Sequence, residues 1–199
     1  TQVLVVGAGP VGLLAALRLK QQGVDVRLIE QQSEHRAHSF PVVLHPQSLR
    51  LLNELGVSAA LFWRGRPVTH LAVYTEYERR AVLQLPGAKG TFSGALTLPQ
   101  DVLRQALSHA LEASGVQIEW NTRLAVLQQD ASGVWGRLLR EDPARLLLGT
   151  AAEKSSFEAD FVIGADGYES TVREALGISM VPHGALETFV FFDAPTSRA

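Results

Sequence analysis

Three glycines near the start of the chain have the spacing of a turn that binds a diphosphate. Gly7, Gly9 and Gly12 follow the apolar run 3–6 and open an apolar helical pattern over residues 13–19. Glycine at these positions permits, in order, a tight turn, close approach of the backbone to a pyrophosphate, and close packing of helix on strand. The unpaired N–H groups and positive dipole end of the first helical turn favour phosphate. The predicted contacts are Gly7, Ala8, Gly9, Pro10, Val11 and Gly12.

An acidic residue stands where such a site needs a partner for a ribose. Residues 24–29 form a second strand-like run, which Glu30 ends and Gln31 follows. A carboxylate at this point can accept hydrogen bonds from a ribose diol, each worth about 1.5–3 kcal/mol. Strand, glycine turn, helix, strand and acid in this order predict dinucleotide binding. The alternative is a glycine turn in another α/β protein with an acid placed by chance, and the pattern does not choose between FAD and NAD.

A second motif follows a later apolar run. Residues 161–164 have the composition of a buried parallel strand, and Asp166 and Gly167 come just after it. Ligand crevices of open α/β sheets form at the carboxyl ends of such strands. Gly167 allows a tight exit, and Ser170 can cap a helix that begins there. From the residues alone, Asp166 is either a ligand contact or the cap of a turn.

The elements between the two motifs predict a mixed α/β fold. Helical spacing is found over residues 46–55 and 98–111, each stopped by glycine soon after. Short strands separated by turn signals predict an antiparallel meander before residue 161. The expected strands are 68–75, 80–85, 116–120, 124–128, 134–139, 146–149 and 161–164.

Composition excludes several classes of function. The chain has 199 residues, of which 46% are hydrophobic and 19% charged, as in ordinary globular proteins. A net charge of −2 without a basic stripe argues against nucleic acid as a partner. The absence of cysteine excludes disulfides and thiolate catalysis, and it fits the cytoplasmic location that we expect. No apolar run approaches the length of a membrane span. Because the sequence begins at Thr1 without an initiator Met, we expect a few residues to be missing there.

With these two motifs in this order, the chain resembles the N-terminal half of the class A FAD-dependent aromatic hydroxylases, the p-hydroxybenzoate hydroxylase-like flavoprotein monooxygenases. That family pairs an N-terminal glycine fingerprint with Asp-Gly at a strand end, followed by serine and arginine at the spacing of Ser170 and Arg173. Residues 43–57 and 98–100 are similar to further family segments. The resemblance extends from about Val3 to Arg173.

The resemblance implies a Rossmann-like FAD-binding fold with a parallel sheet, an antiparallel β-meander crossover and part of a substrate-domain sheet. The FAD-binding domain would comprise residues 1–66 and 97–176, and the incomplete substrate sheet residues 67–96 and 177–199. The resemblance also implies further FAD contacts. Asp166 and Gly167 would lie near the pyrophosphate, Gln100 near the ribityl or phosphate region, the backbone of Leu124 near the adenine, and Arg36 near the phosphates or ribose. An exposed loop arginine is the alternative for Arg36.

The implied activity is hydroxylation of a phenol-like aromatic substrate with NAD(P)H and O2. No residue is singled out as catalytic and no metal site is expected. Family members are roughly twice as long, and their later Gly-Asp motif and proline-rich helix entry have no counterpart after Arg173. We therefore expect a fragment without the C-terminal half that is inactive by itself. The alternatives are a non-catalytic module that binds FAD or another nucleotide, and an NAD-dependent dehydrogenase, against which the antiparallel meander argues.

Overall fold

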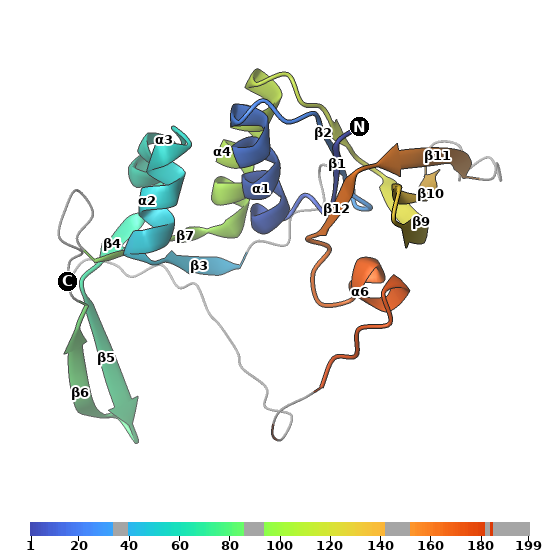
Figure 1. Cartoon of the computed structure of the whole chain (residues 1–199). Helices are drawn as coiled ribbons and strands as arrows, with labels where there is room; N and C mark the ends of the chain where they lie inside the picture. The colour runs from blue at the N-terminus through green and yellow to red at the C-terminus, as the bar shows by residue number, and fades with distance from the viewer. Residues whose placement is uncertain (34–39, 86–93, 142–151, 182–183, 185–199) are drawn as a thin grey trace. The chain divides into compact units, whose positions relative to one another are not determined.

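The computed structural model describes residues 1–33, 40–85, 94–141, 152–181 and 184 (Figure 1). The chain divides into two compact units. The first comprises Thr1–Ala37 and Leu107–Gly184, and the second is built around His38–Ala106. Among the described residues, every helix is too short or too polar to cross a lipid bilayer.

A parallel sheet lies at the centre of the first unit. Its strands are β1 (Val3–Val6), β2 (Val26–Ile29), β8 (Ile118–Glu119) and β12 (Phe161–Gly164), in the order β12-β1-β2-β8. All four residues of β1 are buried, which explains its uninterrupted apolar sequence. Because β12 and β2 flank β1 and run parallel to it, their carboxyl ends lie on either side of the turn that follows β1. The topology therefore brings the glycine turn, Glu30 and the Asp166 motif to one edge of the sheet.

Helix α1 (Pro10–Gln21) packs against β1 and β2 through the buried side chains of Leu13, Ala16 and Leu17. Pro10 occupies its first position, where the missing N–H costs nothing. Gly23 follows its end with a φ of +80°, a conformation that glycine adopts easily. The predicted succession of strand, turn, helix and strand is confirmed, although the second strand begins at Val26 and not at Val24.

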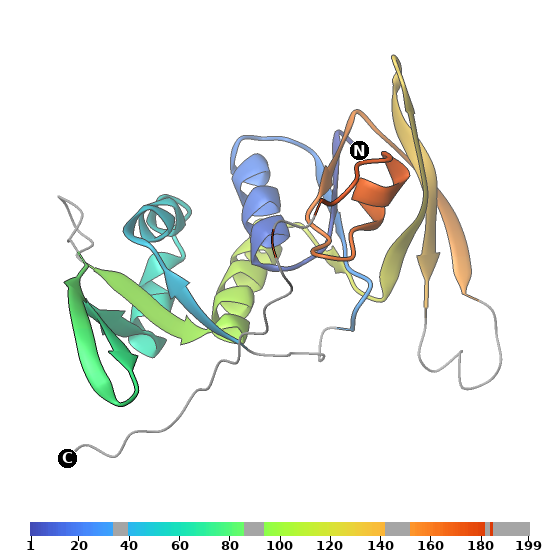
Figure 2. The same cartoon turned by 90° about the horizontal axis from the view of Figure 1, so that it is seen from below.

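The antiparallel meander is also confirmed. Strands β9 (Thr122–Asp130), β10 (Gly133–Arg140) and β11 (Glu153–Ala159) form one sheet in the order β11-β10-β9. The meander and helix α6 (Thr171–Ala175) lie beside the parallel sheet, away from α1 (Figure 2). A shared core joins the layers, formed by Leu4, Val6, Ile29, Leu124, Leu138, Phe157, Ala159 and Val172.

The second unit contains another antiparallel sheet with two helices. Its strands are β3 (Pro41–Leu44), β7 (Ala95–Pro99) and β4 (Arg66–Val68), in the order β3-β7-β4. Its helices are α2 (Pro46–Glu54) and α3 (Ser58–Arg64), and α4 (Gln100–Ala113) continues from β7 into the first unit. The buried side chains of this unit include Leu44, Leu49, Leu52, Leu55, Leu61, Leu96 and Leu98.

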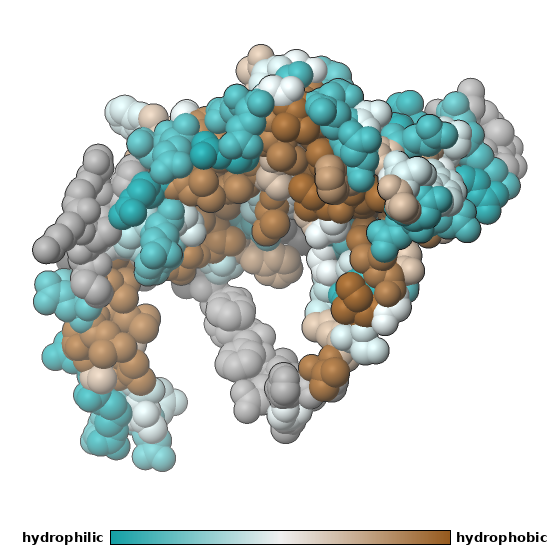
Figure 3. All heavy atoms as spheres, in the orientation of Figure 1, coloured by the Kyte–Doolittle hydropathy of each residue, from teal (hydrophilic) through white to brown (hydrophobic). Residues whose placement is uncertain are grey.

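A hairpin of the second unit leaves all of its strand residues exposed. Strands β5 (His70–Thr75) and β6 (Glu78–Gln84) pair with each other, and Leu71 lies opposite Leu83 on an apolar face. Both side chains are about half exposed, and Figure 3 shows apolar side chains gathered over the hairpin. Both strands were expected from the sequence.

Five elements were not predicted. Strands β3 and β7 are short apolar runs next to proline; no strand was expected at β3, and the end of β7 was expected to open the helix over residues 98–111. Strand β4 overlaps the strand predicted over residues 68–75 only at Val68, because that stretch divides into β4 and β5. Helix α3 had no recognised start signal, and β11 is polar except at its inward-facing Phe157 and Ala159, so that pairing with β10 defines it as a strand. In addition, β8 is shorter than expected, and the strand predicted at 146–149 lies outside the described residues.

The packing of α1 on the turn can be tested at two adjacent positions. A Cβ atom added to Gly12 would lie 1.9 Å from the carbonyl oxygen of Gly7, so backbone would have to move. We expect Gly12→Ala to lower the free energy of unfolding by about 1–3 kcal/mol, as overpacking does. Val11→Ala is the control, because Val11 is 72% exposed and its truncation should change stability by about 0.5 kcal/mol or less. Equal effects in urea denaturation would contradict the packing argument.

Candidate nucleotide-binding site

The glycine turn has one side packed against backbone and one side open. Gly7 has a φ of +103°, and a Cβ atom there would lie 2.4 Å from the carbonyl oxygen of Ala165. By contrast, a Cβ atom on Gly9 would meet nothing within 4 Å. Gly7 and Gly12 therefore let the turn close onto its neighbours, while Gly9 borders space that a ligand can enter. These are the packing properties expected from the glycine spacing.

The first turn of α1 presents N–H groups to this open side. Gly9 is the N-cap residue, and no side chain caps the helix. Pro10 has no N–H, so the backbone donors at this end belong to Gly9, Val11 and Gly12. None of these three has a hydrogen-bond acceptor among the described residues. Such N–H groups and the positive end of the helix dipole suit an anionic group such as a diphosphate.

Glu30 faces the glycine turn. One carboxylate oxygen accepts a hydrogen bond of 2.7 Å from the backbone N–H of Ala8, and the other accepts one of 2.8 Å from the backbone N–H of Gln32. Each carboxylate oxygen has a second lone pair, so the group can still accept from ribose hydroxyls. The backbone of Glu30 is also held, because its N–H donates to Glu119 and its carbonyl accepts from Thr122. The carboxylate is therefore fixed beside the turn before any ligand arrives.

An ion pair that the sequence reasoning missed supports this strand tip. Nε and Nη2 of Arg27 donate to the two carboxylate oxygens of Glu119 at 2.5 and 2.8 Å. The hydrogen bonds and charge of Glu119 raise the pKa of Arg27 above its usual value. The pair joins β2 to β8, three residues before Glu30. Nothing in the sequence connects residues so far apart, so only pairing of the strands reveals it.

Asp166 uses both carboxylate oxygens to cap helix α6. Oδ1 accepts from the hydroxyl of Ser170 at 2.6 Å, and Oδ2 accepts from the backbone N–H of Val172 at 3.1 Å. The Ser170 hydroxyl oxygen accepts in turn from the backbone N–H of Arg173, so the predicted serine cap is confirmed. Gly167 has a φ of +82° and open space where a Cβ would lie. The capping geometry favours the turn-cap interpretation of Asp166.

The remaining predicted residues lie in different surroundings. The side chain of Leu124 is in the core, but its backbone adjoins a β-bulge, because Leu138 pairs with Leu124 while Arg137 pairs with Val126. Gln31 is exposed immediately after Glu30. Gln100 begins α4 in the second unit, where its backbone N–H donates to the carbonyl oxygen of Phe40. Arg36 lies outside the described residues.

The structure thus brings together the glycine turn, Glu30 and the Asp166 motif. It adds Ala165, whose backbone lies against Gly7 and which the sequence reasoning did not single out. The available signal was its position directly before Asp166 at the end of a parallel strand. The functional roles of Gln31, Gln100, Leu124 and Arg36 stay predictions.

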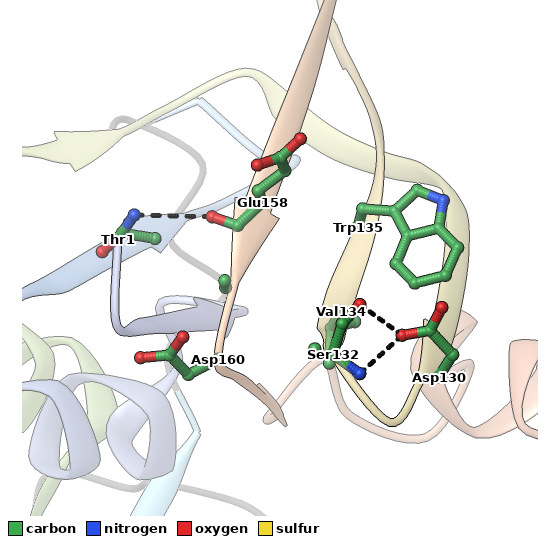
Figure 4. A pocket seen from close by; sticks show the side chains of 9 residues that line it. Thr1, Asp130, Ser132, Val134, Trp135, Glu158 and Asp160 are labelled. Atoms are coloured by element: carbon green, nitrogen blue, oxygen red, sulfur yellow. Dashed lines mark hydrogen bonds between the residues drawn. The ribbon is translucent and has the colours of Figure 1, made fainter.

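An open pocket of about 620 Å³ lies at the other end of the first unit (Figure 4). Two of its lining residues, Thr1 and Asp160, lie just before the starts of β1 and β12. The pocket is therefore at the amino ends of these strands, whereas the glycine turn is at the carboxyl end of β1. Its lining comprises Thr1, Asp130, Ser132, Gly133, Val134, Trp135, Glu158, Ala159 and Asp160.

Within the described part of the chain, no group of three His, Cys, Asp or Glu residues could hold a metal ion.

Comparison with protein families identifies the family of this chain. The model of the FAD binding domain family matches residues 1–198. The chain belongs to this family. FAD is therefore the dinucleotide for which the fold is built, which the glycine pattern alone left open, and the family argues against the dehydrogenase alternative.

The chain is similar to several flavin-dependent monooxygenases. It is 33% identical over 210 residues to 6-methylpretetramide 4-monooxygenase of Streptomyces rimosus, covering 99% of this chain and 34% of that protein. It is 32% identical over 179 residues to pentachlorophenol 4-monooxygenase of Sphingobium chlorophenolicum, covering 89% of this chain and 32% of that protein. The chain thus spans about a third of the length of these curated relatives, less than the half expected.

Solved structures agree with this assignment. The p-nitrophenol 4-monooxygenase PnpA from Pseudomonas putida DLL-E4 matches with a TM-score of 0.77 and 28% identity, over 88% of this chain and 43% of that one. The flavin-dependent monooxygenase PieE in complex with FAD and substrate matches with a TM-score of 0.73 and 25% identity, over 88% of this chain and 32% of that one. The predicted α/β fold and family resemblance are therefore confirmed.

The residues present fit the adenosine diphosphate half of FAD. The open side of Gly9 leaves room where a Cβ would intrude, the N–H groups of the first helical turn are unpaired among the described residues, and a fixed carboxylate stands at the neighbouring strand tip. These three features match the diphosphate and the ribose of a dinucleotide.

A substitution at Gly9 is expected to change ligand affinity without a comparable change in the free energy of unfolding. Replacing Gly9 by Val places a side chain on the open side, where the backbone is extended and an added Cβ would meet nothing within 4 Å. We expect stability to change by about 1 kcal/mol or less, as for an altered N-cap residue. We expect the affinity for ADP to fall by at least about tenfold, because the side chain would displace the phosphates. Isothermal titration with ADP and urea denaturation measure the two quantities, and unchanged ADP affinity would contradict the site.

The paired hydrogen bonds of Glu30 predict an order of variants. In Glu30→Gln only one terminal atom can accept, so one of the two N–H donors loses its partner, at a cost of about 1–3 kcal/mol if it stays dry. Glu30→Ala removes both acceptors and the ribose contact. We expect unfolding free energy and ADP affinity to fall in the order wild type, Gln, Ala. A Gln variant equal to wild type in both measurements would show that the backbone contacts are unimportant.

Proposed function

We propose that this chain is the FAD-binding part of a flavoprotein monooxygenase that uses NAD(P)H and O2 to hydroxylate a phenol-like aromatic substrate. The observation that carries the proposal is the open glycine turn beside the fixed carboxylate of Glu30. The family match supports FAD, and relatives named for pentachlorophenol and p-nitrophenol support a phenolic substrate. A cytoplasmic location remains part of this proposal.

In this proposal the chain binds and orients the cofactor. The N–H groups of Gly9, Val11 and Gly12 receive the diphosphate, and Glu30 accepts from the ribose hydroxyls. The backbone beside the bulge at Leu124 receives the adenine. Further contacts are assigned to Gln31, Arg36, Gln100 and Gly167, and Asp166 is placed near the pyrophosphate. When bound, FAD supplies the chemistry of electron transfer from NAD(P)H and of oxygen activation.

We further propose that residues 1–66 and 97–176 form the FAD-binding domain and that residues 67–96 and 177–199 contribute to a substrate-covering sheet. The exposed apolar face of the β5–β6 hairpin supports the second assignment, because a two-stranded hairpin with such a face is marginally stable alone.

Titration of the purified chain with FAD tests the proposal. We expect quenching of flavin fluorescence on binding, displacement of FAD by ADP, and weaker displacement by adenosine, which lacks the diphosphate. The wild type compared with Gly9→Val links the signal to the turn. A wild-type chain that binds neither FAD nor ADP would refute the proposed cofactor role.

A further inference from the structure

The motif around Asp166 touches the glycine turn through backbone. The Cβ position of Gly7 lies 2.7 Å from the carbonyl carbon of Ala165 and 2.9 Å from the Cα atom of Asp166. The side-chain methyl of Ala165 lies 3.2 Å from the Cβ position of Gly12. The backbone N–H of Ala165 also donates to the carbonyl oxygen of Val6, directly before the turn. The glycine turn therefore packs directly against the Ala165–Asp166 peptide.

The side chain of Asp166 holds this peptide in place through its bonds to the start of α6. Its two oxygens hold the Ser170 hydroxyl and the Val172 N–H, which ties the end of β12 to the start of α6. The side chains of Ser170 and Val172 are buried, so α6 is itself anchored in the core. Movement of the Asp166 backbone would break these bonds, and the turn would lose its support.

We propose that Asp166 is a positioning residue for the diphosphate turn, acting through the Ala165 peptide and α6, and that its negative charge makes no contact on which ligand affinity depends. This inference rests on the proposed function, since it concerns binding at the Gly9 turn. It also has an electrostatic reason: a carboxylate facing a diphosphate would repel it, whereas here both oxygens are turned to donors of the protein.

The variant Asp166→Asn distinguishes the positioning role from a direct contact between the carboxylate charge and the ligand. An asparagine can accept from the Val172 N–H with its oxygen and donate to the Ser170 hydroxyl with its amide, so both links survive without the charge. The positioning role predicts ADP affinity within about twofold of wild type. A direct charge-assisted contact predicts a loss of roughly tenfold or more.

Asp166→Ala removes both links. We expect its ADP affinity to fall roughly threefold to thirtyfold, the range for loss of a helix cap, while its adenosine affinity stays near that of wild type. Ser170→Ala should act in the same direction, and the double variant should lose less than the sum of the two, because both residues belong to one network.

The chain offers a matched control at the far end of the sheet. Oδ1 of Asp130 accepts from the backbone N–H and the hydroxyl of Ser132, at 2.7 and 2.5 Å (Figure 4). Like Asp166, Asp130 accepts from one serine hydroxyl and one backbone N–H, although here both donors belong to Ser132 and bond the same oxygen. Asp130 lies in the turn between β9 and β10, outside the glycine turn and the Asp166 motif. Asp130→Ala should leave ADP affinity within about twofold of wild type.

Isothermal titration of wild type and the variants with ADP and adenosine decides the matter. Retained ADP affinity in Asp166→Asn, together with selective loss in Asp166→Ala, supports the positioning role. A loss in Asp166→Asn equal to that in Asp166→Ala overturns it in favour of direct contact, and equal losses in Asp166→Ala and Asp130→Ala overturn it in favour of general destabilisation. Failure of the wild type to bind ADP refutes instead the proposed function.

Discussion

The contact between the backbone of Gly7 and that of Ala165 is the constraint on which the site depends. Two parallel strands end side by side, and the chain after each must turn away without room for a side chain between them. Glycine at position 7 makes this possible both by its positive φ and by its missing Cβ. Because the turn closes so tightly on this side, it opens on the other, where Gly9 and the first N–H groups of α1 border free space.

Two carboxylates, those of Glu30 and Asp166, lie at the same edge of the sheet but have different hydrogen-bond partners. Glu30 accepts from the turn itself through the Ala8 N–H and retains lone pairs toward the space beside it. Asp166 directs both oxygens to α6, where two donors compensate its charge. An anionic ligand can therefore approach the turn with one acid available to a hydroxyl-bearing sugar and the other engaged in hydrogen bonds with the protein. The different partners of these two side chains, and not their types, decide their roles.

Prediction from the sequence succeeded where local signals agreed with the fold. The apolar runs of β1 and β12, the proline at the start of α1 and the glycine after it each specify their element without distant partners. It failed at β11, whose polar sequence becomes a strand only by pairing with β10, and at β3 and β7, which pair with each other across many intervening residues. In the site, the fingerprint and Glu30 were found from spacing, whereas Ala165 and the Arg27–Glu119 pair were not, because their contacts join residues distant in the chain.

The sequence by itself determined that this chain has a dinucleotide turn, an acid at the neighbouring strand tip and an Asp-Gly motif after a third strand, because each depends on residues adjacent in the chain. Its resemblance to flavoprotein monooxygenases followed from the same motifs, and the family match bears it out. Only the tertiary structure decided that the two motifs are in direct contact and that Asp166 is held by α6. The physical reason is that strand order sets which ends meet, and a local pattern of residues does not encode that order.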